Sequence, residues 1–276
     1  MPIKYIDCPT HEINILDTTE LKLSPTLNRK GVFKNKFDIF TFIELESNII
    51  NMPVIMLSDV HSHGFEVIEH LEKICDLSQY DIITCGDMAG EPEYGSDGDP
   101  TKLYQLIKSK CKNLYIVQGN HDLPPQDIDE LFDIINDDKN PCVLSDGLDI
   151  RETSFGTLGG VHGTVQHGYM QNPSKYYKKD APHYYALVQN ILEQKPYIFA
   201  THDMPSLEYY DEETNSNVKC NGKEELFNIV NKLKPVMHIY GHGYHENFIT
   251  FINKTYFVNL EHRILIWNPI DCDILV

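Results

Sequence analysis

Basic residues are scarce in this sequence. The chain of 276 residues contains 23 Lys and Arg against 41 Asp and Glu, which gives a formal net charge of -18. A surface that binds long nucleic acids displaces counterions from many phosphates and therefore needs clustered basic side chains. The composition thus argues against extended nucleic acid as a partner and favours a small substrate.

Long apolar runs and paired cysteines are also missing. No stretch approaches the roughly 18 apolar residues that span a bilayer, so we expect no membrane association. The seven cysteines are widely spaced and include no C-x-x-C pair, which is typical of reduced thiols. Residues 1–10 show no basic stretch leading into an apolar one, as a secretory leader would. We therefore predict an unprocessed cytoplasmic protein.

The sequence does contain enough apolar material for one large core. Hydrophobic residues make up 41% of the chain, and we predict a single domain over residues 1–276. An N-terminal extension (1–50) is expected to pack on this core, because the partly alternating run 37–45 predicts an edge strand or a hairpin. Residues 248–267 predict three short strands of an antiparallel second sheet.

Short strand-like runs alternate with helical periodicity between these segments, which indicates an α/β fold. The strand-like runs are residues 54–57, 82–85, 114–117, 197–200 and 236–240, and the helical ones are 65–75, 103–107, 125–135, 187–192 and 226–233. In the first helical run Phe65, Ile68, Leu71 and Cys75 fall on one face, the face expected to pack on the sheet.

Carboxylates, imidazoles and one amide stand where the predicted strands end. They are Asp59 and His61, Asp87, Asn120 and His121, His202, and His242. In open α/β sheets ligands bind beyond the carboxyl ends of the strands, so these side chains are expected at one edge. Oxygen and imidazole groups are ligands for divalent ions. The set therefore predicts a site for two divalent metal ions.

These groups resemble, in order, the motifs of the calcineurin-like metallophosphoesterase superfamily. The motifs are Asp59-Val60-His61, Gly86-Asp87, Gly119-Asn120-His121-Asp122, His202 and Gly241-His242. The resemblance covers about residues 52–262 and implies a four-layer α-β-β-α sandwich of two mixed sheets with flanking helices. It also implies a phosphoesterase in which a hydroxide held between two ions attacks phosphorus in line with the leaving group.

The resemblance also implies roles for single residues. The first ion would be bound by Asp59 and His61, the second by Asn120, His202 and His242, and both by Asp87. His121 would stand near the leaving-group oxygen, with Asp122 fixing its tautomer and orientation. The mixed oxygen and nitrogen ligands would accept Mn, Fe, Zn, Co or Ni, of which Mn is favoured.

The last motif departs from the family pattern G-H-x-H. Two residues separate the histidines in Gly241-His242-Gly243-Tyr244-His245. A bulge at Gly243 would return His245 to the first ion; the alternative is a looser first site completed by water or another side chain. His238 competes for this place, but it lies inside an apolar run and is interpreted as a core histidine.

Five further residues are candidate substrate contacts: His63, His162, His167, Lys178 and Lys179. His63 could instead cap the following helix, and the glycine-rich loop that holds His162 and His167 could be a structural turn. The two lysines lie in the tyrosine-rich segment 169–185. This segment could stack on a nucleobase and contact phosphate, or it could form a lid whose tyrosines pack on the core.

The choice of ester rests on the resemblance. Protein serine/threonine phosphatases of this superfamily carry arginines in the second and third motifs, where this chain has Met88-Ala89-Gly90 after Asp87 and Gln118 before Gly119. We predict a phosphodiesterase that acts on a small or nucleotide-like substrate. The alternative is a phosphomonoesterase, including a protein phosphatase. A non-catalytic protein-binding scaffold is the alternative of another class, and the retained metal-ligand motifs count against it.

Overall fold

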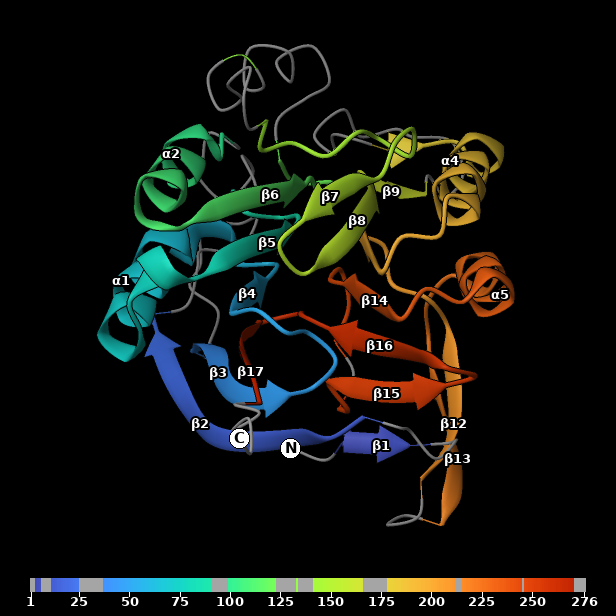
Figure 1. Cartoon of the computed structure of the whole chain (residues 1–276), viewed down its shortest axis with the longest axis horizontal. Coiled ribbons are helices and arrows are strands. Elements are labelled where there is room, and N and C mark those ends of the chain that lie inside the picture. The colour runs from blue at the N-terminus through green and yellow to red at the C-terminus, as the bar shows by residue number, and fades with distance from the viewer. Residues whose placement is uncertain are drawn as a thin grey trace, which may run out of the picture.

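The computed structural model describes residues 3–5, 11–24, 37–90, 99–122, 133, 141–165, 178–211, 215–244 and 246–270. Within these residues the strands form one six-stranded sheet, one seven-stranded sheet and two separate strand pairs (Figure 1). None of the described helices combines the length and the apolar character needed to cross a bilayer.

The six-stranded sheet has the order β2-β3-β17-β4-β5-β6. The strands are β2 (Ile13–Leu23), β3 (Asp38–Ser47), β17 (Arg263–Pro269), β4 (Val54–Leu57), β5 (Asp81–Cys85) and β6 (Asn113–Val117). β4, β5 and β6 are parallel, whereas β17 is antiparallel to β4 and parallel to β3. The run 37–45 falls largely in β3, which lies one strand in from the edge because β2 pairs antiparallel outside it.

The seven-stranded sheet has the order β1-β15-β16-β14-β11-β8-β7. The strands are β1 (Ile3–Tyr5), β15 (Ile249–Ile252), β16 (Thr255–Asn259), β14 (Met237–Tyr240), β11 (Ile198–Thr201), β8 (Gly156–Val161) and β7 (Arg151–Thr153). The prediction of three strands in residues 248–267 is confirmed, but not their placement in one antiparallel sheet. β15 and β16 pair antiparallel, whereas β17 crosses to the other sheet. Apolar spacing shows that a strand is buried but not which sheet receives it.

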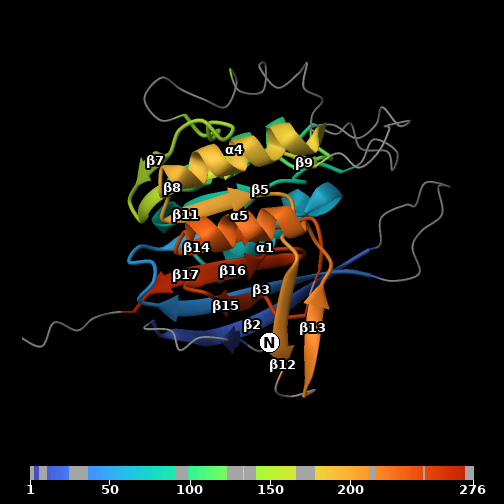
Figure 2. The same ribbon diagram turned by 90° about the vertical axis from the view of Figure 1, so that its right-hand side faces the viewer.

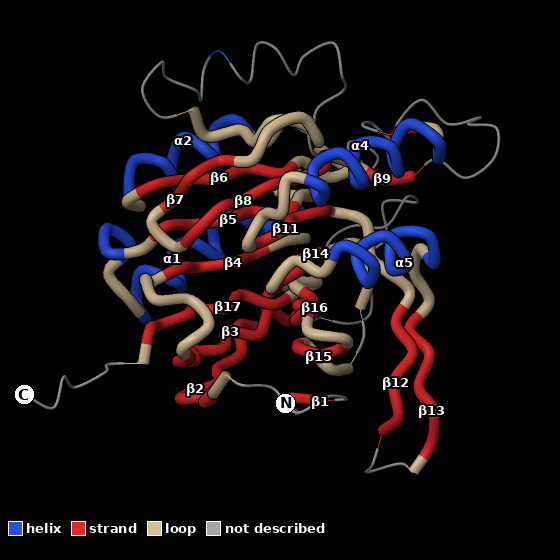
Figure 3. The backbone as a smooth tube through the Cα atoms, turned by 45° about the vertical axis from the view of Figure 1, so that its right-hand side comes forward, coloured by secondary structure: helices blue, strands red, loops and turns tan. Residues whose placement is uncertain are grey.

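Helices cover the outer faces of both sheets (Figures 1 and 2). They are α1 (Gly64–Ile74) and α2 (Thr101–Lys110) on the six-stranded sheet, and α4 (Ala181–Glu193) and α5 (Glu224–Leu233) on the seven-stranded sheet. Two short 3-10 turns are η1 (His61–His63) and η2 (Leu77–Gln79). In the two separate strand pairs, β9 (Thr164–Val165) pairs with β10 (Lys178–Lys179), and β12 (Leu207–Asp211) pairs with β13 (Ser216–Cys220). The β12–β13 hairpin extends away from the sheets (Figure 3). The helix predicted at 125–135 lies outside the described residues except for position 133.

Three clusters of buried apolar side chains hold these layers together. Met56 and Ile198 belong to the cluster between the two sheets. Leu71 belongs to the cluster that joins α1 and α2 to the six-stranded sheet, and Val188 to the one that joins α4 and α5 to the seven-stranded sheet. The order of layers is therefore helix, sheet, sheet, helix, and the predicted α/β fold with two mixed sheets is confirmed.

The helix α1 shows how periodicity can mislead at its first turn. Its buried residues are Gly64, Val67, Ile68 and Leu71, whereas Phe65 is 52% exposed. The prediction that Phe65 faces the sheet was wrong. Phe65 directly follows Gly64, so it is turned by roughly 100° away from the position that packs on α2.

Candidate metal centre at the strand ends

Two groups of possible metal ligands meet at the carboxyl ends of the strands. Asp59 and His61 follow β4, Asp87 follows β5, His202 follows β11 and His242 follows β14. Among the described residues, the candidate ligand atoms of Asp59, His61 and Asp87 lie within 4.8 Å of one another, and so do those of Asp87, His202 and His242. Asp87 belongs to both groups. This arrangement is the geometry needed for two neighbouring cations that share one carboxylate.

Asn120 lies at the end of β6 and has an unsatisfied side chain. The residue is fully buried, and neither amide atom has a hydrogen-bond partner within the part of the chain that the structure describes. Burying an amide without a partner costs roughly 1–3 kcal/mol, so such groups are rare outside functional sites. A cation bound by the amide oxygen would remove part of this cost. The residues present therefore fit a metal site.

Four of the candidate ligands have a left-handed backbone. The φ angles are 56° at Asp59, 47° at His61, 52° at Asp87 and 60° at His242. Residues other than glycine adopt this conformation rarely, at a cost of roughly 1–3 kcal/mol each, and such residues concentrate at functional sites. The strain is offset by hydrogen bonds between the loops. Asp59 N–H donates to the Gly86 carbonyl and His61 N–H to the Asp87 carbonyl, both at 3.0 Å.

Glycines in the motifs allow the loops to approach the carboxylates. A Cβ atom on Gly119 would lie 2.1 Å from Oδ1 of Asp87, and one on Gly241 would lie 2.1 Å from Oδ2 of Asp59. Both distances are far inside van der Waals contact. Because of this close approach, the amide after Asn120 donates to Asp87 Oδ1 (His121 N, 2.8 Å) and the amide of His242 donates to Asp59 Oδ2 (3.1 Å).

His202 is oriented by a backbone carbonyl behind it. Its Nδ1 lies 2.7 Å from the carbonyl oxygen of Cys85, so Nδ1 carries a proton and donates it there. The other nitrogen, Nε2, points to Asp87 Oδ2 at 3.2 Å. A second hydrogen bond that fixes the tautomer in this way is the usual support of a metal-binding histidine.

Charge at the centre is governed by Asp87 and His202. Burial by itself raises the pKa of a carboxyl group, but the imidazoles around Asp87, His202 above all, hold its pKa well below the ordinary value. Burial by itself lowers the pKa of His202, whereas Asp87 and then Asp59 hold it well above the ordinary value. A proton and a cation therefore compete for the Nε2 of His202.

Glu261 is a site residue that the motifs did not indicate. Its backbone bridges to Ser58, next to Asp59, and its Oε2 is buried with no hydrogen-bond partner among the described residues. Burial and then the charge of Glu261 raise the pKa of Asp59 well above its usual value. Glu261 lies in the turn between β16 and β17, where an acidic residue gives no signal in the sequence.

Asp122 has a role in the loops that the motif did not indicate. The Asp122 carboxylate accepts four hydrogen bonds from backbone amides: those of Asp87 (3.1 Å), Met88 (2.8 Å), Ala89 (3.1 Å) and Gly119 (2.8 Å). Four acceptor sites are the full capacity of a carboxylate. Asp122 therefore ties the loop after β5 to the loop after β6. His121 itself is 7% exposed, and its Nε2 lies 3.8 Å from Asp87 Oδ2.

Two of the candidate substrate contacts are used inside the protein. His162 is 1% exposed; the amide of Gln118 donates to its Nδ1 (2.9 Å), and its Nε2 donates to the Leu144 carbonyl (2.8 Å). Lys179 pairs with Asp146 at 3.0 Å and donates to the His162 carbonyl. Both residues are structural, because their polar atoms already hold the chain together.

The other candidate contacts are placed as follows. His63 is largely buried and its Nε2 lies 3.2 Å from Asp38 Oδ2, so it joins η1 to the start of β3. Lys178 is described only as backbone in β10, where it pairs with Thr164. His167 and His245 lie outside the described residues.

His238 is a core residue, as its place in an apolar run predicted. It is fully buried in β14, and its Nε2 lies 2.8 Å from the hydroxyl of Thr201. That hydroxyl donates to the Asp203 carbonyl, so it accepts from Nε2–H of His238. Burial lowers the pKa of His238 to about 3.

This low pKa predicts a pH-dependent loss of stability. Between pH 6.5 and 3 the unfolded chain binds a proton at His238 that the folded protein does not, so the free energy of unfolding falls by up to about 1.4 kcal/mol per pH unit. His238→Gln keeps a donor for Thr201 but removes the titration. Between pH 6.5 and 4.5, urea denaturation of metal-stripped protein should show that the free energy of unfolding falls more steeply for the wild type than for this variant. Equal slopes for the two proteins would contradict the assignment of His238 as a buried, neutral histidine.

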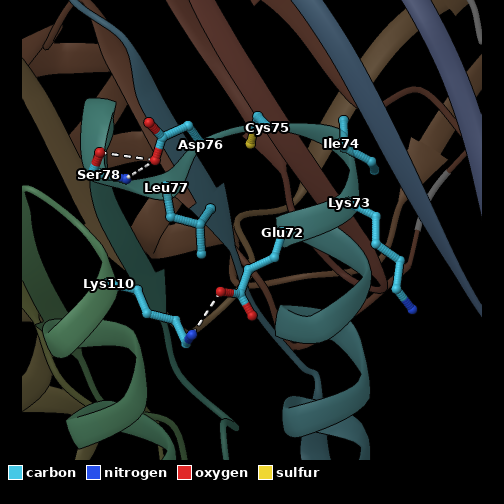
Figure 4. A pocket seen from close by; sticks show the side chains of 8 residues that line it. All are labelled: Glu72, Lys73, Ile74, Cys75, Asp76, Leu77, Ser78 and Lys110. Atoms are coloured by element: carbon cyan, nitrogen blue, oxygen red, sulfur yellow. Dashed lines mark hydrogen bonds and ion pairs between the residues drawn. The ribbon is translucent and has the colours of Figure 1, made fainter.

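An open groove between the ends of α1 and α2 is a separate feature (Figure 4). Lys110 forms an ion pair with Glu72 at 2.6 Å, and the Asp76 carboxylate accepts from the backbone and hydroxyl of Ser78. Since α1 begins at the carboxyl end of β4, its last turn lies toward the opposite edge of the sheet. The groove is thus remote from the candidate ligands, and its polar groups pair with one another.

Comparisons with known proteins agree with the fold. The model of the calcineurin-like phosphoesterase family matches residues 52–245. The crystal structure of the protein TT1561 of Thermus thermophilus aligns with a TM-score of 0.54 at 13% identity, over 76% of this chain and 89% of that one. A second crystal structure aligns with a TM-score of 0.57 at 14% identity, over 76% of this chain and 91% of that one. No curated protein matches the sequence significantly.

Proposed function

Since this chain belongs to the calcineurin-like phosphoesterase family, we propose that it is a phosphodiesterase that uses two divalent metal ions and acts on a small or nucleotide-like substrate. The observation that carries the proposal is the position of Asp87, which is shared by two groups of ligand atoms, each within 4.8 Å. The buried amide of Asn120, which has no hydrogen-bond partner among the described residues, supports it independently.

We assign the ligands of each ion from this geometry and from the family motifs. Asp59 and His61 would hold the first ion together with Asp87, and the last motif assigns His245, which lies outside the described residues, to that site. His202 and His242 would hold the second ion with Asp87, and the third motif adds the amide oxygen of Asn120. Such a mixture of oxygen and nitrogen ligands suits Mn and its first-row neighbours Fe, Co, Ni and Zn, with Mn favoured.

The chain's own residues carry the remaining work. When bound, the ions supply hydroxide near neutral pH and neutralise charge on the phosphate oxygens. His121 would donate a proton to the leaving-group oxygen, the role that the third motif of the family implies, and its Nε2 lies 3.8 Å from Asp87 Oδ2. Asp122 holds the loops of Asp87 and His121 in register through its four backbone hydrogen bonds.

The preference for a diester rests on the missing arginines of the protein phosphatase motifs and on what their absence means for charge. A phosphomonoester carries up to two negative charges at the phosphate, and a diester carries one. The residues that follow Asp87 are the buried Met88 and Ala89, and the residue before Gly119 is the buried Gln118. None of these side chains is a cation that would neutralise a second phosphate charge. Hydrolysis of the singly charged diester is therefore the better match.

Comparing two synthetic esters tests this preference. The metal-loaded protein should hydrolyse bis-nitrophenyl phosphate with a higher kcat/KM than nitrophenyl phosphate. A higher value for the monoester would assign the protein as a phosphatase instead. Stoichiometric metal binding without hydrolysis of either ester would favour the scaffold alternative.

A further inference from the structure

Tyr244 presents an aromatic ring beside the metal centre. The side chain is 63% exposed. Tyr244 follows His242 by two residues, so their Cα atoms are at most about 7 Å apart. His242 is itself an exposed member of the group formed with Asp87 and His202. The ring therefore stands at the border of the site and not on a distant surface.

The ring is held from below by a buried cation. The guanidinium carbon of Arg263 lies 4.3 Å from the centre of the Tyr244 ring. Arg263, at the start of β17, is only 1% exposed. A guanidinium at this distance is attracted to the face of an aromatic ring, and the attraction is stronger where water is excluded. One face of Tyr244 is thus occupied by Arg263.

The backbone around Tyr244 is fixed by the same network. Arg263 donates from Nη1 to Oδ1 of Asn259 and from Nη2 to the Glu246 carbonyl. Asn259 in turn donates from Nδ2 to the carbonyl of Gly243 at 2.7 Å. Gly243 and Glu246 are therefore tied to β16 and β17, and the ring is positioned before any ligand arrives.

A single exposed aromatic is ordinary on a protein surface, and exposure alone would carry no conclusion. Tyr244 differs because the buried Arg263 packs against one face of its ring and because it lies two residues from the candidate ligand His242. It is also one of the two residues that separate the histidines of the last motif, where the family pattern has one. A rigid ring that is already oriented loses little entropy when a flat group stacks on it.

We propose that Tyr244 is a stacking platform for a planar aromatic group of the substrate, such as a nucleobase or an aryl ring. The inference rests on the proposed function for the phosphate end of the substrate, which the metal centre would hold. Tyr244 would then determine the specificity for the group that is esterified to the phosphate. An ester without a flat ring would be bound through its phosphate alone.

Ligand binding tests the platform without relying on turnover. Isothermal titration of the Mn-loaded protein would compare adenosine 5′-monophosphate, phenyl phosphate and ribose 5-phosphate, which lacks the base. Tyr244→Ala should raise the Kd of the adenosine nucleotide about tenfold, which is within the range of base stacking on aromatic side chains. The Kd of ribose 5-phosphate should change by less than about twofold, because that compound has no group to stack.

Two variants and the third ligand separate the explanations. Tyr244→Phe keeps the ring and should bind like the wild type, whereas Leu148→Ala removes an apolar side chain of similar exposure beside the last turn of α4 and should have no effect. If Tyr244→Ala weakens binding of both the nucleotide and phenyl phosphate, the platform accepts any flat ring. If it weakens binding of the nucleotide alone, the platform is specific for a nucleobase. Equal effects on all three ligands, or a wild type that shows no preference or no binding, would overturn the proposal. Absence of ester hydrolysis with the binding pattern intact would instead count against the proposed phosphodiesterase activity.

Discussion

Replacement of Asp87 by Asn is expected to remove nearly all phosphoesterase activity. The carboxylate is the one ligand common to both groups, and a neutral amide would weaken both ions at once. Each ion contributes several kcal/mol to transition-state stabilisation. Since 1.36 kcal/mol corresponds to a factor of ten in rate, a loss of roughly a thousandfold or more is expected. Steady-state kinetics and metal analysis of the same sample would measure both effects.

The Asn variant should still fold, because one oxygen remains to accept the His121 amide now bound by Asp87 Oδ1. Asp76→Asn is a matched control that removes one negative charge from an exposed turn remote from the site. It should leave turnover and metal content unchanged. Near-normal turnover together with a full metal complement in the Asp87 variant would refute the assignment of the bridging ligand.

Replacement of His121 by Gln should separate proton transfer from metal binding. His121 lies beside the shared carboxylate, and its ring centre is 5.5 Å from that of His61, yet it belongs to neither group of ligand atoms. A general acid of this kind contributes about 10²–10⁴ to the rate. We expect kcat to fall within that range for an ester with an alkyl leaving group. Metal content should remain that of the wild type.

The leaving group provides the decisive contrast for His121. A nitrophenolate departs without being protonated, so the loss of kcat with a nitrophenyl ester should be much smaller than with an alkyl ester. His70→Gln, in α1, serves as the control histidine. Equal losses with both esters, or loss of bound metal from the His121 variant, would show that this residue acts through the ions and not as an acid.

The sequence predicted which elements deliver polar groups to the site, because that depends only on where each apolar run ends. Asp59, Asp87 and His202 all follow short strands, and these three strands, β4, β5 and β11, are buried along their whole length. Such strands appear as continuous apolar runs, and their ends can be located without knowledge of the fold.

What the sequence did not predict depends on contacts between distant segments. Nothing in the sequence indicated that Asp122 binds backbone amides, three of which belong to a loop more than thirty residues earlier. His162 and Lys179 were considered as substrate contacts, yet both are used in holding the chain together. Glu261 gave no signal at all. Each of these outcomes is decided by which backbone atoms the folded loops bring within hydrogen-bonding distance.

A metal titration combined with turnover measurements tests whether two bound ions are needed for hydrolysis. Chelator-stripped protein would be titrated with Mn²⁺ while bound metal and hydrolysis of bis-nitrophenyl phosphate are recorded on the same sample. We expect two ions per chain, no hydrolysis before metal is added, and full turnover only when the second ion is bound. Hydrolysis by the stripped protein in the presence of chelator, or saturation of turnover at one ion per chain, would contradict this expectation.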